Sequence, residues 1–247
     1  PSPSRYAQQF SLLAALAPGQ QPHAWQVDLA MPQACDNRLV RVPTGLGKTF
    51  GVLGAWWWNR IAQRRADWPR RLVWCLPMRV LVEQVVAEAE AALARVGSQA
   101  VPIPVHALMG GAEAGDWHLA PEREAVLVGT QDMLLSRALN RGYAAPRARW
   151  PMDFGLLNQD CLWVMDEVQL MDAGLATSAM SAIMYGLSVT MGRGVVCTTV
   201  CTSAGGASCA TKRALGSSWA AAPMDKTTAR MSMMVMIRFL IIILLLC

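Results

Sequence analysis

The sequence predicts an α/β domain with three layers, in which a mostly parallel sheet lies between two layers of helices. Apolar runs at 72–76, 125–128 and 161–165 are typical of strands that are buried on both faces of a parallel sheet. Helical patterns separate these runs, so successive strands are joined by helical crossovers. A glycine-rich loop at 43–47 stands between another short apolar run and a helical pattern. An irregular tail is expected to follow the domain.

The remaining elements follow from local patterns. Residues 6–16, 50–64, 80–96 and 133–139 predict helices, 101–108 predicts a strand, and 112–123 and 140–159 predict loops. The triplet Trp56-Trp57-Trp58 could indicate side chains that stack on nucleic-acid bases. On a helix, however, three consecutive side chains face different directions. We therefore expect these rings to pack in the core.

Charge is distributed unevenly along the chain. Residues 1–180 contain 16 Lys and Arg and 16 Asp and Glu, so the net charge of +5 falls entirely on residues 181–247. A neutral body argues against a broadly basic nucleic-acid coat and favours a local groove. One basic cluster is expected to be a solvated helix end and loop: Arg60, Arg64, Arg65, Arg70 and Arg71.

Cysteine and histidine usage gives little sign of a protein metal site. None of the seven cysteines forms a C-x-x-C pair, and the three histidines are scattered. Cys35, Cys75 and Cys161 are typical of buried free thiols in a reducing compartment. No secretory signal pattern opens the chain, and no apolar segment reaches the roughly 20 residues of a membrane helix. We expect a cytoplasmic protein without a membrane partner.

The glycine loop has the pattern of a phosphate-binding loop. The run Leu39–Val42 leads into Pro43-Thr44-Gly45-Leu46-Gly47, and Lys48-Thr49 opens a helix. Glycines let backbone N–H groups surround phosphate oxygens, and the helix directs its positive end at the same anion. The lysine would reach the β- and γ-phosphates of ATP, and the threonine hydroxyl would bind magnesium. Val42 stands where the general pattern has glycine, a departure that several helicase families share.

Two adjacent carboxylates end the most convincing buried strand. Asp166 and Glu167 follow the apolar run 161–165, and burial of such charges is costly unless they meet a cation. Magnesium on ATP is the natural cation. Asp166 would hold the ion and Glu167 would orient and deprotonate the attacking water. The separation of 118 residues from Lys48 leaves room for the intervening β-α units.

Other polar residues are expected at the same edge of the sheet. Gln26 alone would be read as a surface glutamine of a helix. Its position ahead of the glycine loop favours a glutamine that reads an adenine edge with its amide. Arg79 and Gln84 follow strand 72–76. Thr130 and Asp132 follow strand 125–128, where they either cap the next helix or hold a strand phosphate.

In these motifs the sequence resembles superfamily 2 helicases. Residues 43–49 resemble motif I, Gln26 the Q motif, 76–84 motif Ia and 166–169 a DExx-box motif II. Met109-Gly110-Gly111 and 128–132 look like motifs Ib and Ic. Within the superfamily, the runs 129–138 and 164–178 resemble the helicase of type I CRISPR systems, in the type I-U (I-G) branch.

The resemblance implies a RecA-like fold and ATP-driven translocation on single-stranded DNA, with a Cascade-type effector complex as partner of the intact protein. It implies that Gln169 couples the nucleotide site to motif III. Strand contacts carry over to these residues: Pro77, Arg79, Gln84, Gly110, Gly111, Thr130 and Asp132. The resemblance covers about residues 20–179. A Ser-Ala-Thr motif III, a second RecA-like domain and an HD nuclease are not found in the sequence.

The predicted organisation is an N-terminal extension at 1–20, the first RecA-like domain at 21–179 and a tail at 180–247. The tail holds four of the seven cysteines and ends in the apolar run 239–247, which is an aggregation liability. A frameshifted reading frame is the favoured explanation, and a weakly packed extension or a tail anchor are the alternatives. Two other functions stay open: an RNA helicase or restriction-type translocase, and an inert nucleotide- or nucleic-acid-binding fragment.

Overall fold

The structure is a computed structural model. It describes residues 2–43, 45–97, 102–110 and 115–171, and the backbone of 191–192, 195–196 and 239–245. The helices are α1 (Pro3–Leu13), α2 (Ala24–Ala30), α3 (Lys48–Trp56), α4 (Arg79–Val96), α5 (Gln131–Ala138) and α6 (Trp150–Asn158). The strands are β1 (Arg38–Arg41), β2 (Arg71–Leu76), β3 (Val105–Leu108), β4 (Ala125–Thr130), β5 (Cys161–Met165), β6 (Met191–Gly192), β7 (Val195–Val196) and β8 (Phe239–Leu245). Short helical turns lie at Trp57–Ala62, Trp117–Leu119, Arg147–Arg149 and Val168–Leu170.

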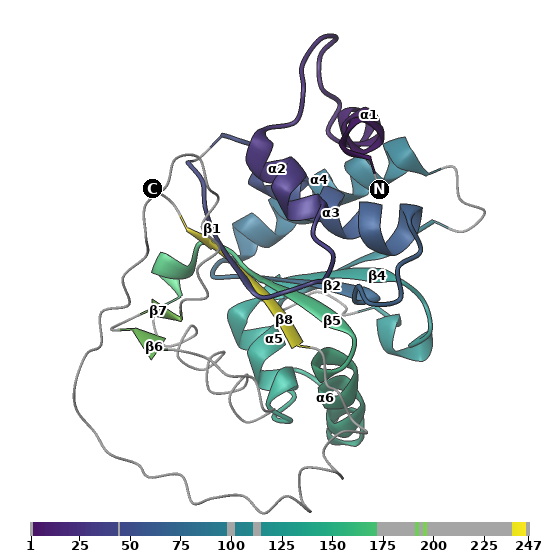
Figure 1. Cartoon of the computed structure of the whole chain (residues 1–247). Coiled ribbons are helices and arrows are strands. Elements are labelled where there is room, and N and C mark those ends of the chain that lie inside the picture. The colour runs from purple at the N-terminus through teal and green to yellow at the C-terminus, as the bar shows by residue number, and fades with distance from the viewer. Residues whose placement is uncertain are drawn as a thin grey trace, which may run out of the picture.

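Six strands form one parallel sheet in the order β1-β8-β5-β2-β4-β3, and β6 pairs with β7 in a separate ribbon. Helices α1 to α4 cover one face of the large sheet, and α5 and α6 cover the other (Figure 1). The expected three-layer α/β fold with a parallel sheet is therefore confirmed. All six strands run the same way, so their carboxyl ends meet at one edge.

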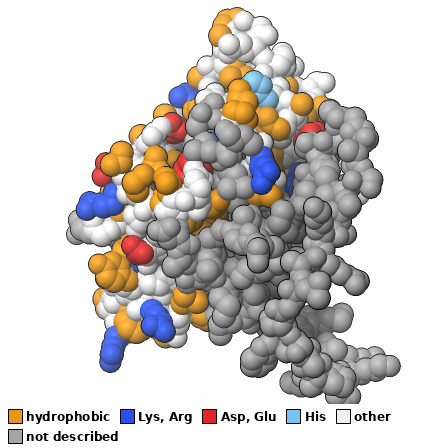
Figure 2. Space-filling view, turned by 90° about the vertical axis from the view of Figure 1, so that its left-hand side faces the viewer, with side chains coloured by type: hydrophobic (Ala, Val, Ile, Leu, Met, Phe, Trp, Pro, Cys, Tyr) orange, Lys and Arg blue, Asp and Glu red, His pale blue; other side chains and the backbone are white. Residues whose placement is uncertain are grey.

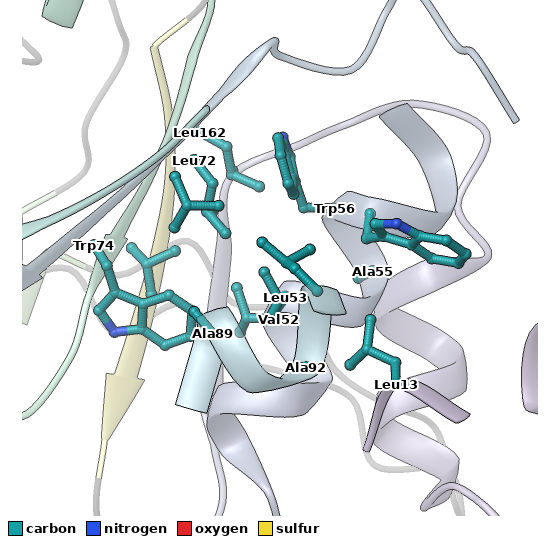
Figure 3. Packing of buried hydrophobic residues seen from close by; sticks show 14 of the residues in the cluster. Leu13, Val52, Leu53, Ala55, Trp56, Leu72, Trp74, Ala89, Ala92 and Leu162 are labelled. Carbon is teal, nitrogen blue, oxygen red and sulfur yellow. The ribbon is translucent and has the colours of Figure 1, made fainter. Parts of the chain in front are cut away.

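The alternation of side chains along β2 shows how the two layers are held. Leu72, Trp74 and Leu76 pack in the cluster that includes α1 to α4, whereas Val73 and Cys75 pack in the cluster that includes α5 and α6. Figure 3 shows Leu72 and Trp74 facing the aliphatic side chains of α3 and α4. Burial on both faces explains why the strand sequence is continuously apolar rather than alternating.

Helix α3, which follows the glycine loop, is clamped by the N-terminal helices. A Cβ at Gly51 would lie 2.3 Å from the Trp25 ring, and a Cβ at Gly54 would lie 2.8 Å from the Phe10 ring. The two glycines therefore let α1 and α2 approach α3 more closely than any other residue would. The predicted extension 1–20 thus contributes α1 to the core of the domain.

The three consecutive tryptophans are core residues, as predicted: Trp56, Trp57 and Trp58 are 0%, 7% and 1% exposed. Figure 3 shows Trp56 next to the strand residues Leu72 and Leu162. The helix changes to a π-helical turn at Trp57–Ala62, which places all three rings on buried surface.

Two local predictions were wrong. Residues 140–159 are not only a loop, because α6 occupies Trp150–Asn158 and carries Asp153, which is fully buried in an ion pair with Arg137 of α5 at 3.0 Å. Arg71 is not solvated: it is 5% exposed and donates to the carbonyl oxygens of Pro121 and Gln159. In both cases a tertiary partner outweighs the local composition.

Strand β8 lies between β1 and β5, and its backbone pairs with both (Figure 1, yellow strand). Arg38 to Arg41 are in register with residues 242–245, and Cys161 to Met165 with residues 239–243. In the part of the chain that the structure describes, β8 is the only strand that pairs with β1. An apolar run that was expected to be a liability therefore has a place in the sheet. The explanations offered for the tail itself stay predictions.

Candidate nucleotide-binding site

The loop after β1 has the backbone that a phosphate cradle requires. Gly45 and Gly47 have φ values of +82° and +67°, in the left-handed region that favours glycine. Gly47 occupies the N-cap of α3, so Lys48 and Thr49 are the first two residues of the helix. Pro43 and Gly45 are exposed, while Leu46 and Thr49 are half-buried. Thr44 lies outside the described residues.

Gln26 holds this loop from the side. Its amide nitrogen donates to the carbonyl oxygens of Gly47 and Leu46 at 3.1 and 3.4 Å, and its amide oxygen accepts from the His23 N–H at 2.9 Å. The side chain is only 3% exposed. In this structure Gln26 fixes the position of the loop, and its predicted contact with adenine stays a prediction.

Lys48 meets both carboxylates of the DExx motif across the sheet edge. Its Nζ lies 3.0 Å from Glu167 Oε1 and 3.8 Å from Asp166 Oδ1. All three side chains are largely buried. The structure thus brings together three residues predicted for one site, although 118 residues separate Lys48 from Asp166 in the sequence.

Asp166 is held by two residues of β2 and by the adjacent Glu167. Its N–H donates to the Cys75 carbonyl oxygen at 3.1 Å, its Oδ1 accepts from the Glu167 N–H at 2.9 Å, and its Oδ2 accepts from Trp74 Nε1 at 3.3 Å. Burial raises the pKa of the Asp166 carboxyl, and the Lys48 ammonium and the Trp74 indole oppose that shift. A carboxylate in this position gains from a cation beside it.

Glu167 is constrained in both backbone and side chain. Its φ of +55° is in the left-handed region, which costs a non-glycine residue about 1–3 kcal/mol and is typical of functional sites. Oε1 meets Lys48 and Oε2 accepts from Gln169 Nε2 at 2.6 Å. Gln169 therefore contacts directly the carboxylate that pairs with Lys48.

The predicted magnesium ligands fit that ion chemically. Thr49 offers a hydroxyl and Asp166 a carboxylate, and magnesium prefers such oxygen donors. Thr49 is the second residue of α3, directly after the glycine loop, and Asp166 lies 3.8 Å from the adjacent Lys48. Asp166 is 6% exposed, and this burial disfavours its charged form. When bound, the ion would neutralise phosphate charge.

The residues predicted to hold nucleic acid lie at the other half of the same edge. Pro77 and Arg79 join β2 to α4, and the Arg79 and Gln84 side chains are exposed, Gln84 donating to Glu88 at 3.2 Å. These residues form no cluster with the nucleotide site. Figure 2 shows Lys and Arg side chains scattered singly over the described part of one face, with no continuous basic patch.

Thr130 and Asp132 were predicted either to cap the next helix or to hold a strand phosphate, and the structure supports the capping alternative only in part. Thr130 occupies the N-cap of α5 but its hydroxyl makes no capping hydrogen bond, and Asp132 lies exposed in the first turn. Thr130 is 8% exposed. Gly110 has open space around its Cα, and Gly111 lies outside the described residues. Their strand contacts stay predictions.

The sequence-based reasoning missed two residues. Trp74 contacts the Asp166 carboxylate, and Trp25 packs against Gly51 beneath the glycine loop. In the sequence Trp74 is one residue of an apolar strand pattern, and no local pattern indicates that its indole N–H contacts a carboxylate. Trp25 precedes Gln26 directly, so an aromatic residue beside the Q motif was the available signal.

Comparison with known families decides the assignment. Residues 26–206 match the family of DEAD/DEAH box helicases, which is more than half of the chain. The chain belongs to the DEAD/DEAH box helicases. The match continues beyond residue 179, where the domain boundary was predicted. The chain therefore carries the ATP-hydrolysing domain of a helicase family, as the motifs indicated. No curated protein sequence gives a significant match.

Several solved helicase structures are similar to this chain at low sequence identity. The DUF1998 helicase MrfA gives a TM-score of 0.49 at 12% identity, over 71% of this chain and 27% of that one. MrfA bound to DNA and AMPPNP gives 0.49 at 17%, over 68% and 22%. Mss116p bound to ssRNA and AMP-PNP gives 0.47 at 14%, over 96% and 42%. This helicase chain thus spans less than half the length of these proteins.

Among the described residues, no helix is both long and apolar enough to cross a membrane.

Proposed function

We propose that this helicase chain binds ATP with magnesium where the ends of β1 and β5 converge, and that it hydrolyses ATP as one of two RecA-like domains of a nucleic-acid translocase. The observation that carries this proposal is the convergence of Lys48, Asp166 and Glu167 within 3.0–3.8 Å. Lys48 and Thr49 would hold phosphate and metal, and Glu167 would take the proton of the attacking water.

Two contacts of the Glu167 carboxylate bear on how ATP would bind. Lys48 is paired with Glu167, and Gln169 bonds the other oxygen of the same carboxylate. When Lys48 turns to the phosphates, the Glu167 carboxylate is released from its ion pair and can face the attacking water. The exchange couples nucleotide binding to release of the base. It also means that ATP competes with an internal ion pair, so we expect weak ATP affinity in the isolated chain.

Hydrolysis by the isolated chain should be nearly absent. In this superfamily the nucleotide lies between two domains, and an arginine from the second domain meets the charge of the transition state. We propose that the intact protein supplies that domain. Measurable unwinding by this chain alone would contradict the proposal.

The test is nucleotide binding by Lys48→Ala, measured with a fluorescent ATP analogue and magnesium. Binding should fall at least about tenfold, because the variant loses a charge-assisted contact to phosphate. Arg123→Ala removes an exposed positive charge away from the site and is the matched control. Equal nucleotide binding by the two variants would contradict the proposed ATP site. An inert nucleic-acid-binding fragment would show no ATP binding with either variant and would keep its strand binding.

For the nucleic acid, we propose single-stranded DNA, and for the intact protein a role in type I CRISPR interference in the cytoplasm with a Cascade-type complex. Motifs 129–138 and 164–178 support this branch, and the neutral body with exposed Arg79 supports a local strand groove. Fluorescently labelled DNA and RNA of the same sequence should be titrated against the chain with ATP analogue present. Tighter RNA binding would favour the RNA helicase alternative.

A further inference from the structure

Trp74 donates a hydrogen bond to the DExx motif and has no role in the proposed reaction. Trp74 lies in the middle of β2, is 1% exposed, and its indole Nε1 is 3.3 Å from Asp166 Oδ2. Figure 3 shows the nitrogen on the part of the ring away from Val52 and Leu53, so the ring packs in the core while its polar atom leaves it. A buried indole N–H usually finds an acceptor, and for Trp74 the acceptor is the Asp166 carboxylate.

The hydrogen bond fixes how the carboxylate is turned. With Oδ2 held by the indole, Oδ1 is the oxygen that faces the Glu167 N–H at 2.9 Å and Lys48 Nζ at 3.8 Å. Rotation of the Asp166 side chain would break both bonds. The main chain is anchored as well, because the Asp166 N–H donates to the Cys75 carbonyl oxygen on the same strand as Trp74. Two consecutive residues of β2 therefore set the position of Asp166.

We propose that Trp74 is a positioning residue for the magnesium–nucleotide site, which presents the Asp166 carboxylate toward the metal that accompanies ATP. This inference rests on the proposed function. An orienting hydrogen bond behind a metal ligand is worth about 10–100-fold in metal affinity in other proteins. A tryptophan that only filled space would have no such effect, because phenylalanine would fill most of the same volume.

The experiment compares Trp74→Phe with Trp56→Phe. Trp56 belongs to the same buried cluster and donates to the Pro69 carbonyl oxygen at 2.9 Å, so both variants lose one buried indole hydrogen bond. Only Trp74→Phe should raise the magnesium concentration for half-maximal binding of a fluorescent ATP analogue, by about tenfold. Binding of the analogue without magnesium should be equal in the two variants. Equal magnesium dependence would overturn the proposal.

A second readout works without nucleotide. In a ¹⁵N spectrum of the unliganded chain, Asp166→Asn should shift the indole N–H signal of Trp74, which is identified by its absence in Trp74→Phe, and leave that of Trp56 in place. No shift would overturn the contact. If the shift is seen but no variant binds nucleotide, the positioning role fails together with the proposed function, while the hydrogen bond stands.

If Trp74→Phe fails to fold, benzothienylalanine at position 74 replaces it. This analogue keeps the two-ring shape and carries sulfur in place of the N–H group. A magnesium dependence equal to that of the unmodified chain would then contradict the proposal, and a raised requirement would support it.

Discussion

The carboxyl edge of the sheet has two halves that hold their polar residues differently. At the ends of β1 and β5, Lys48, Asp166 and Glu167 are buried and bonded to one another. At the ends of β2 and β4, Arg79 and Asp132 are exposed and belong to no such cluster. The nucleotide half is preorganised, at a cost in burial and backbone strain. The strand half presents separate groups for a ligand to bring together.

The largest effect is expected from Glu167→Gln. Loss of the proposed base should lower residual ATP hydrolysis at least about 100-fold. Nucleotide binding should be kept or strengthened, because Lys48 loses the closer of its two anionic partners. Single-turnover hydrolysis and analogue binding measure the two effects. Glu124→Gln, which affects only the half-exposed pair with Arg60, is the control and should change neither. Parallel loss of binding and hydrolysis would show that the carboxylate is structural.

Gly51→Ala tests how far the nucleotide half depends on the helices beneath it. The new Cβ would lie 2.3 Å from the Trp25 ring and 3.2 Å from Gln26 Cγ, so α2 must move. Such overpacking should lower the free energy of unfolding by about 1–3 kcal/mol. Urea unfolding measures the change, and weaker nucleotide binding should accompany it through Gln26.

Gly155→Ala is the matched control for that substitution. Gly155 is also helical, but nothing lies within 4 Å of its added Cβ. We expect a gain of about 0.4–1 kcal/mol in the free energy of unfolding, from reduced freedom of the unfolded chain. Equal gains at the two positions would mean that helix propensity, and not the contact with Trp25, sets the effect at Gly51.

Arg79→Ala tests the other half. Removal of one phosphate contact should weaken binding of single strands and reduce the slope of log affinity against log salt by about 1. Stability should change by less than about 0.5 kcal/mol, because the side chain is exposed. Fluorescence anisotropy at several salt concentrations gives the slope. An unchanged slope would mean that Arg79 does not contact the bound strand. Arg123→Ala is the control for the loss of one positive charge.

Asp166→Asn should give the smallest effect, a gain in stability at neutral pH. Burial raises the pKa of the Asp166 carboxyl, so the folded chain binds that proton more tightly than the unfolded chain. At pH above the folded-state pKa, the ionised group therefore lowers stability. The variant should raise the unfolding temperature at neutral pH, and the gain should fade as the pH drops toward the ordinary value of 3.8. Asp132→Asn, at an exposed position, should show no such gain.

The comparison also explains what the sequence could predict. The strands at 72–76, 125–128 and 161–165 and the loop ending in Lys48 are encoded in consecutive residues, so local patterns identify them. Convergence of Lys48 with Asp166 followed from the rule that parallel strands end at one edge. These predictions needed no knowledge of distant contacts.

The failures share a physical cause. Helix α6 is stabilised by Asp153, whose two oxygens bond Arg137 and Arg149, and that pairing outweighs a composition rich in arginine and proline. Arg71 is buried because two backbone carbonyl groups accept from it. The Trp74 contact depends on side-chain orientation across two strands. None of these is visible in a window of neighbouring residues.

The place of β8 in the sheet has a consequence for synthesis of the chain. Strand β1 ends at Arg41, whereas β8, its partner in the described sheet, begins at Phe239. At about 5–20 residues per second, a ribosome needs about 10–40 s to cover that interval. The strand that leads into the phosphate loop waits for its neighbour throughout that interval. Assembly of the ATP site is therefore expected to follow the synthesis of β8 and not that of the phosphate loop.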